Sequence, residues 1–235
     1  MQPADQPSLT AVPVNRHAAA IDLAIALAFF LGCSAALPLL DPILRHGRGV
    51  GMVFAAAGYQ FACEGLVLLL IMAIRHERFS DYGFTARNTA KSIALALVLT
   101  AIYDLAMSWR AGALLWVPLR RQPAVRMSLA AGFPLSLAGL AVTVAAWGFF
   151  EGFFGVFFAK KLNQAVGHSG RGWLSPGVLG FALFNGLIHL AIGQGLEGFL
   201  GSFASGYAIA VIPAVTASAW GSVLVQTLTN AVGKL

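Results

Sequence analysis

Charged residues are scarce in this sequence of 235 residues: only 10% are Asp, Glu, Lys or Arg, whereas 58% are hydrophobic. A soluble domain carries about 25% charged residues, so this chain lacks the polar surface that keeps a protein dispersed in water. Its few charges lie between long apolar runs, a pattern typical of a chain whose solvent is mostly lipid. The composition therefore predicts an integral, multi-pass membrane protein and excludes a soluble globular domain.

Acidic residues are the rarer charges, with nine acids against 15 Lys and Arg and a net charge of +6. A basic excess can indicate nucleic-acid binding, but these residues form short clusters beside hydrophobic segments. The clusters are Arg45 and Arg48, Arg75 and Arg78, Arg120 and Arg121, and Lys160 and Lys161. Such flanking residues meet lipid headgroups, whereas a nucleic-acid groove needs one continuous basic face. We predict the lipid bilayer as a partner and no nucleic acid.

Cysteine is also scarce, and both cysteines, Cys33 and Cys63, fall inside apolar runs. This position favours small hydrophobic residues in helix packing over a disulfide. The first residues are polar and the first apolar run is too long for a cleavable signal peptide, so we expect none.

Long apolar runs predict an all-α, polytopic transmembrane helix bundle of about seven spans. Residues 1–16 contain three prolines and are expected to form a flexible tail, which leaves 17–235 as a single transmembrane domain. The expected spans are 18–40 (stopped by Asp41-Pro42), 50–74, 92–109, 128–159 and 176–192, followed by two short helices within 199–232 that join near Pro213 to Ser218. The run 128–159 exceeds the roughly 20 residues needed to cross, so it is tilted, kinked near Pro134, or extends beyond the bilayer. Lys and Arg counts on alternate sides give no clear orientation.

Polar side chains inside these spans are costly and mark candidate functional positions. They are Asp22, Glu64, Asp104, Glu151, Asn185, His189, Gln226 and Asn230. Asp22 lies near a span end and is expected to reach the interface. For Glu64 and Asp104 a protonated or hydrogen-bonded packing role is favoured over a functional one.

The strongest candidate site combines three segments. Glu151 lies among the aromatic residues of 147–155, which exclude water, and such a carboxyl is a candidate general base. His189 follows Asn185 by one helical turn on the same face, and Gln226 and Asn230 are likewise four residues apart. Each residue alone could serve only in helix packing. Together they predict a membrane-embedded site.

The order and spacing of these pieces resemble the CPBP intramembrane endopeptidases, which include the CAAX prenyl proteases and bacterial Abi-type immunity proteins. The likeness covers about residues 75–233. Segment 79–87 resembles the family's short loop of the LGLR kind, and Glu151 with the following Lys160-Lys161 resembles its EExxxR helix. His189 falls at the family's FxxxH, while segments 203–206, 216–220 and 226–230 resemble its closing helix pair with HxxxN.

The resemblance implies that Glu151 activates water, that His189 assists, and that Gln226 and Asn230 stabilise the oxyanion formed on the scissile carbonyl. One acid and its basic companion are missing from the EExxxR pattern, and Gln226 stands where the family has its last His. We expect no cofactor and no metal, because zinc usually has three or four protein ligands. The resemblance also implies a bacterial inner membrane, with the Lys160-Lys161 end on the cytoplasmic side.

Three functions follow from these observations. The first is a glutamic-type intramembrane peptidase that cleaves a peptide or a membrane-anchored protein. The alternative is a catalytically degenerate relative that acts as an immunity, maturation or assembly factor. A small transporter is the lesser alternative, with Glu64, Asp104 and Glu151 as a proton relay. The sequence carries no signal for an oligomeric state.

Overall fold

The computed structural model describes residues 15–46, 49–113 and 123–230, and within these ranges the chain is helical with no strand. The expected flexible tail therefore lies outside the described residues except for its end, where Arg16 begins the first helix. The basic pair Arg120 and Arg121 also lies outside them. Five of the described segments are long and apolar enough to cross a bilayer: Arg16–Ala36, Val50–Arg75, Thr89–Arg110, Leu135–Ala165 and Pro176–Thr216. They suggest an integral membrane protein.

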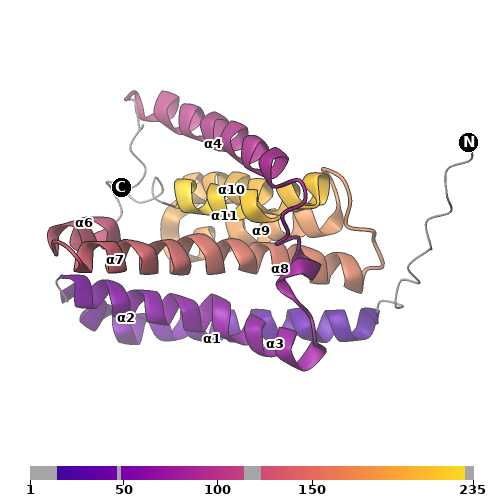
Figure 1. The fold of residues 1–235 in the computed structure, drawn as a ribbon, viewed down its shortest axis with the longest axis horizontal. Coiled ribbons are helices and arrows are strands. Elements are labelled where there is room, and N and C mark those ends of the chain that lie inside the picture. Colours follow the sequence, from indigo (N-terminus) through magenta and orange to yellow (C-terminus); the bar gives the residue numbers. More distant parts are fainter. Residues whose placement is uncertain (1–14, 47–48, 114–122, 231–235) are drawn as a thin grey trace, which may run out of the picture.

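The helices form a bundle around a central rod. This rod consists of α7 (Leu135–Thr143) and α8 (Glu151–Ala165), joined by a π-helical turn at Val144–Phe150. On one side lie α1 (Arg16–His46), α2 (Val50–Phe61) and α3 (Val67–Arg75) (Figure 1). On the other side lie α9 (Pro176–His189), α10 (Gly195–Thr216) and α11 (Trp220–Thr229), and α4 (Thr89–Ala111) crosses the outside of α10 and α11 (Figure 1). The rod therefore touches both layers.

The helical bundle is confirmed, but a count of seven spans is not. The last long segment doubles back where Gly193 (φ +82°) and Gly195 (φ +66°) leave helical geometry, so α9 and α10 pack side by side. The expected turn near Pro213 to Ser218 is present between α10 and α11, with Ala217 at φ +59°. The 10 residues of α11 rise about 15 Å, well short of the ~30 Å of a hydrocarbon core.

Two expected boundaries were wrong. The run 128–159 is interrupted near Pro134, where a kink was one of the expectations, but the change of direction is a full turn: α6 (Pro123–Ala130) ends before Gly132 (φ +72°) and packs back on α7. The segment long and apolar enough to cross instead begins after Pro134 and continues to Ala165. Conversely, α1 continues through Asp41-Pro42 to His46, since proline fits helical φ and costs less in apolar surroundings where helices are the only stable backbone.

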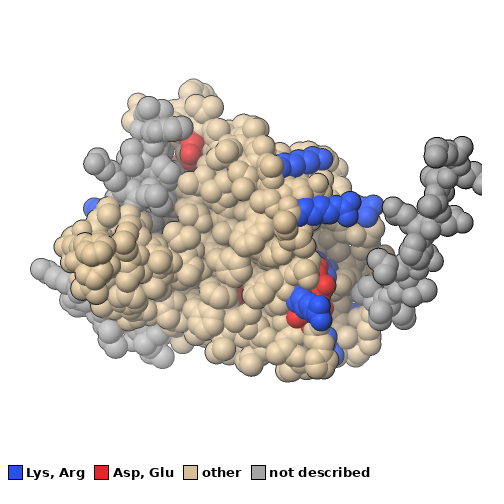
Figure 2. Space-filling model, in the orientation of Figure 1, with Lys and Arg blue, Asp and Glu red and all other residues tan. Residues whose placement is uncertain are grey.

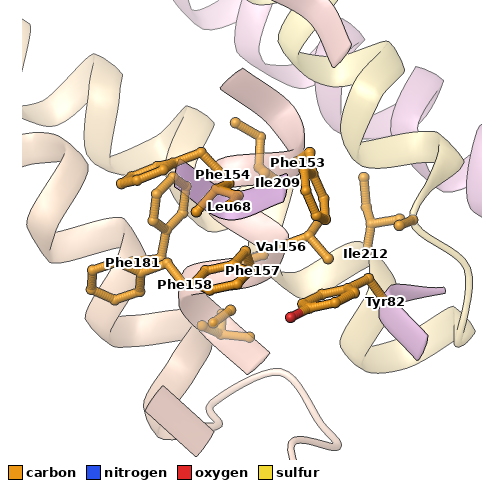
Figure 3. Packing of buried hydrophobic residues seen from close by; sticks show 14 of the residues in the cluster. Leu68, Tyr82, Phe153, Phe154, Val156, Phe157, Phe158, Phe181, Ile209 and Ile212 are labelled. Atoms are coloured by element: carbon orange, nitrogen blue, oxygen red, sulfur yellow. The ribbon is translucent and has the colours of Figure 1, made fainter. Parts of the chain in front are cut away.

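Phenylalanines on α8 form the centre of the core. Phe153, Phe154, Phe157 and Phe158 are all buried on this helix (Figure 3). Tyr82 stacks on Phe157 with ring centroids 5.6 Å apart. Close packing of large rings restricts the position of α8, and α8 carries Glu151 at its first residue.

Charged residues of α1, α3, the segment directly after α3 and α8 meet in a partly buried ion cluster, which we define as Asp22, Arg75, Glu77 and Lys161. The Lys161 ammonium lies 2.9 Å from Asp22 Oδ2 and 2.7 Å from Glu77 Oε1, and Arg75 Nη2 lies 2.8 Å from Asp22 Oδ1. Asp22 and Lys161 are only 3% and 2% exposed. The expectations that Asp22 reaches the interface and that Lys161 meets headgroups are therefore wrong: paired opposite charges can be buried where single charges cannot.

Tyr82 extends this cluster and predicts a pH dependence. Its hydroxyl donates to Glu77 Oε2 at 2.5 Å, and burial together with this hydrogen bond raises the pKa of Tyr82 well above its usual range. The folded protein therefore keeps the proton above pH ~10, where an unfolded tyrosine releases it. The free energy of unfolding should fall as pH rises through that value, by up to about 1.4 kcal/mol per pH unit from this group.

Tyr82→Phe tests this linkage. At pH 8 we expect the variant to be about 1 kcal/mol less stable, because it lacks the hydrogen bond to Glu77. Between pH 10 and 11 the difference in stability between wild type and variant should close. Only the wild type has a Tyr82 proton that is released on unfolding, so only its free energy of unfolding falls as pH rises. Thermal unfolding in detergent across pH 8–11 measures both curves, and a gap that stays constant would contradict the linkage.

Candidate functional site

Glu151 is held at the junction of three helical segments. Its Oε2 accepts a hydrogen bond of 2.6 Å from Asn230 Nδ2, at the end of α11. The same oxygen lies 3.5 Å from Gln60 Nε2 on α2, and Asn230 Nδ2 also lies 3.4 Å from the carbonyl of Trp147. Two amides therefore hold the Glu151 carboxylate in one orientation and restrict its rotation.

A small cavity lies beside this carboxylate. It measures about 20 Å³, and its polar lining residues are Glu64, Glu151, Asn185 and Gln226. The rest of the wall is apolar, formed by Phe30, Phe154, Phe181, Phe184, Ile188 and Ile209. A space of this size accommodates one water molecule, provided that polar groups surround it. The lining supplies those groups.

Glu64 is the second carboxylate of the cavity. It is 7% exposed, and its Oε2 has no hydrogen-bond partner anywhere in the described part of the chain. A buried carboxylate oxygen without a partner costs free energy unless a water or substrate atom meets it. A residue with an unpartnered carboxylate oxygen and a second carboxylate thus line the same water-sized space.

Both carboxylates are associated with π-helical turns, which often occur at functional sites. Glu64 lies in the turn Ala62–Leu66 between α2 and α3, and Glu151 directly follows the turn Val144–Phe150. A Cβ on Gly65 would come within 2.8 Å of the Phe150 ring. Glycine at this position therefore lets the α2–α3 segment approach the central rod closely enough for Glu64 to reach the cavity.

The last helix brings Gln226 and Asn230 to the site, and its position depends on Gly221. A Cβ there would lie 2.3 Å from the Ser92 carbonyl oxygen on α4, while the Gly221 amide donates to Ser92 Oγ at 2.8 Å. Because the obstacle is backbone, the neighbour cannot rotate away. This close contact sets where α11 begins.

Gly221→Ala should therefore separate α11 from α4 and lower stability by about 1–3 kcal/mol, the usual cost of overpacking. Gly58→Ala on α2 is the matched control, since a Cβ at Gly58 meets nothing within 4 Å. Thermal unfolding in detergent compares the two. Equal melting temperatures for both variants would show that the α4–α11 contact is not tight.

The structure brings together three of the four residues that the sequence predicted for the site. Glu151 and Gln226 line the cavity and Asn230 binds Glu151. His189 is not part of the cavity wall, and its Nδ1 lies 2.8 Å from Gln194 Oε1 in the π-helical turn Leu190–Gln194. Asn185, one turn earlier on α9, lines the cavity in its place and donates to the Ser202 carbonyl at 2.8 Å.

Sequence reasoning missed Gln60 and assigned Glu64 to packing. The signal was present, because the two residues are four apart and so lie on one helix face. Nothing local to the segment indicates that this face meets Glu151, 91 residues further along the chain than Gln60. Asp104, the third acid of the possible relay, lies on α4 and is not in the cavity wall.

The described residues contain no group of three or more His, Cys, Asp or Glu side chains that could hold a metal ion. Comparison with known proteins found no matching family model, no matching curated protein and no matching solved structure. The function is therefore argued from the geometry of the site.

Proposed function

We propose that this chain is a multi-pass integral membrane protein that hydrolyses a peptide bond of a membrane-anchored protein or peptide, with Glu151 as general base. The single observation that carries the proposal is a carboxylate held by Asn230 beside a cavity with room for one water. Its resemblance to CPBP endopeptidases supports the same chemistry and a bacterial inner membrane. The missing second acid of the EExxxR pattern has a candidate replacement in Glu64, which lines the same cavity from another helix.

In the proposed reaction Glu151 takes a proton from the cavity water while the water oxygen bonds to the scissile carbonyl carbon. The carbonyl oxygen becomes an oxyanion, and the buried Gln226 amide (6% exposed) is available to donate to it. The carbon–nitrogen bond then breaks, and the proton passes from Glu151 to the leaving amine. Glu64 holds the water in place by accepting a hydrogen bond from its other O–H group.

Two observations favour a second candidate, a catalytically inactive relative that binds a partner. The cavity of about 20 Å³ is far smaller than the pockets of about 300–1,000 Å³ that hold ligands, so a peptide enters only if the surrounding phenylalanines move. His189, which the resemblance makes an assisting residue, lies against Gln194. In this case the polar residues around the cavity are a structural feature of the bundle and not a catalytic site.

The experiment that separates the two compares cells that produce wild-type protein, Glu151→Gln or His189→Ala. Mass spectrometry of membrane fractions identifies new peptide termini in each strain. Glu197→Gln is the control, because Glu197 is an exposed acid (side chain 77% exposed) that pairs with Arg110 away from the cavity. Termini that appear with wild type and Glu197→Gln but not with Glu151→Gln support the peptidase. Identical termini in all strains support the binding protein, and the His189→Ala strain shows whether that side chain takes part.

A further inference from the structure

A second and much larger cavity lies at the end of the bundle where α8 and α10 end and α4 begins. This cleft measures about 720 Å³. Figure 2 shows Lys and Arg side chains gathered toward the same end, where α3 also ends. Its walls come from the loop before α4, from α4, α8 and α10, and from the loop after α8. The cleft plays no part in the proposed hydrolysis.

We propose that this cleft is a binding site for a phosphate group, such as the headgroup phosphate of an anionic lipid or of a soluble phosphate compound. Three cationic side chains from three segments line it: Lys91 on α4, Lys160 on α8 and Arg171 in the loop after α8. Asp81 is the one acid among the described residues that line it. The balance of three cations against one carboxylate attracts an anion of charge −1 or −2.

Lys160 is already positioned for such a ligand. Its ammonium donates to the Asp81 backbone carbonyl at 2.9 Å and lies 4.0 Å from the centre of the Tyr82 ring. An ammonium has three donors, so these contacts fix the group while leaving hydrogens for a phosphate oxygen. Lys91 and Arg171 are exposed at the rim, and neither forms an ion pair with any residue that the structure describes.

Lys91 also lies at a helix position that is electrostatically unfavourable for a lysine. It is in the first turn of α4, which begins at Thr89, and the positive end of a helix dipole repels a cation. Helix electrostatics therefore do not account for a lysine here, whereas an anion in the cleft would pair with both the lysine and the helix end.

His168 adds an imidazole donor. Its Nδ1 lies 3.0 Å from the Gly170 backbone N–H, from which it accepts a hydrogen bond. Because Nδ1 is the acceptor, the ring N–H is on Nε2 and is available in the wall of the cleft. Phosphate oxygens accept from several donors at once, so a mixed set of ammonium, guanidinium and imidazole groups suits them.

Apolar residues also line the cleft, among them Val156, Ala210, Pro213 and Val215. A wall of this kind beside a basic rim suits the glycerol and first acyl carbons of a lipid whose phosphate meets the cations. A free phosphate compound would use the rim alone.

Calorimetric titration of the purified protein in a neutral detergent tests the proposal. The ligands are short-chain phosphatidylglycerol, short-chain phosphatidylcholine and inorganic phosphate. The variant is Lys91→Gln/Arg171→Gln, and Arg126→Gln is the control, because Arg126 is an exposed cation on α6 at the other end of the bundle (Figure 1). We expect saturable binding of phosphatidylglycerol that weakens roughly tenfold or more in the double variant and is unchanged in the control.

If inorganic phosphate binds with the same dependence on the two cations, the site takes a soluble phosphate compound and the phosphate chemistry stands. If only phosphatidylglycerol does, the occupant is a lipid. The proposal is overturned if no ligand saturates, if phosphatidylcholine binds as well as phosphatidylglycerol, or if the double variant and Arg126→Gln bind like wild type. None of these outcomes depends on peptidase activity, so failure here is distinct from failure of the proposed function.

Discussion

Glu151→Gln is expected to lower the rate of peptide cleavage by roughly 10²–10⁴-fold, the usual contribution of a positioned general base. Glutamine has nearly the same shape, so the core around α8 should stay packed, but its amide cannot take a proton from water. The glutamine side chain can present either its oxygen or its N–H group to Asn230 Nδ2, which in the wild type lies 2.6 Å from Glu151 Oε2. The measurement is the initial cleavage rate of a substrate peptide identified from the membrane fractions.

Companion variants define which acids belong to the site. Glu64→Gln should also slow cleavage, because Glu64 lines the same cavity, whereas Asp104→Asn on α4 should leave the rate within about twofold of wild type. If Asp104→Asn instead lowers the cleavage rate as much as Glu151→Gln, the acids needed for cleavage are not confined to the cavity. A Glu151→Gln rate close to that of wild type would remove Glu151 from the mechanism.

Lys161→Met is expected to destabilise the fold by about 3–5 kcal/mol, the cost of removing one member of a buried ion pair. Lys161 is the only cation in the described residues that contacts both Asp22 and Glu77. Its loss leaves Asp22 with Arg75 alone and leaves Glu77 with the Tyr82 hydroxyl. Chemical or thermal unfolding in detergent measures the change.

Two controls show that the effect comes from charge. Lys160→Met should cost much less, because Lys160 is half-buried and meets a carbonyl and a ring instead of two carboxylates. Lys161→Met/Glu77→Gln should be more stable than Lys161→Met alone, since the double change removes one charge of each sign. A double variant that is no better than the single one would mean that packing around Lys161 matters and the ion cluster does not.

The sequence predicted the helical elements well where apolar runs are bounded by polar residues. Composition alone indicated a helical membrane bundle, and the turn between α10 and α11 was expected near Pro213 to Ser218. Runs whose boundaries depend on tertiary packing were predicted less well. A kink near Pro134 was one expectation for 128–159, but nothing local shows that the chain reverses there, because the α6–α7 contact that stabilises the reversal is formed only in the folded chain.

The site was also predictable only in part, because its residues are brought together by tertiary packing. Glu151, Gln226 and Asn230 stand out because polar residues are costly in apolar segments. Which of them meet is a question of helix packing, and the close approach of Gly65 to the Phe150 ring is one of the contacts that place Glu64 at the cavity. Likewise, the partners of Asp22 are Arg75 and Lys161, 53 and 139 residues away along the chain, so its burial as part of an ion cluster could not be read from its own surroundings.

The most direct test of the central claim, that Glu151 activates a water for peptide hydrolysis, is isotope incorporation. Purified wild-type protein and Glu151→Gln are each incubated in lipid nanodiscs with a substrate peptide in H₂¹⁸O-enriched water, and the products are analysed by mass spectrometry. The account predicts that wild type yields a new carboxyl terminus with one ¹⁸O atom and that Glu151→Gln yields almost none. Equal amounts of labelled product from both proteins, or no product from wild type, would contradict it.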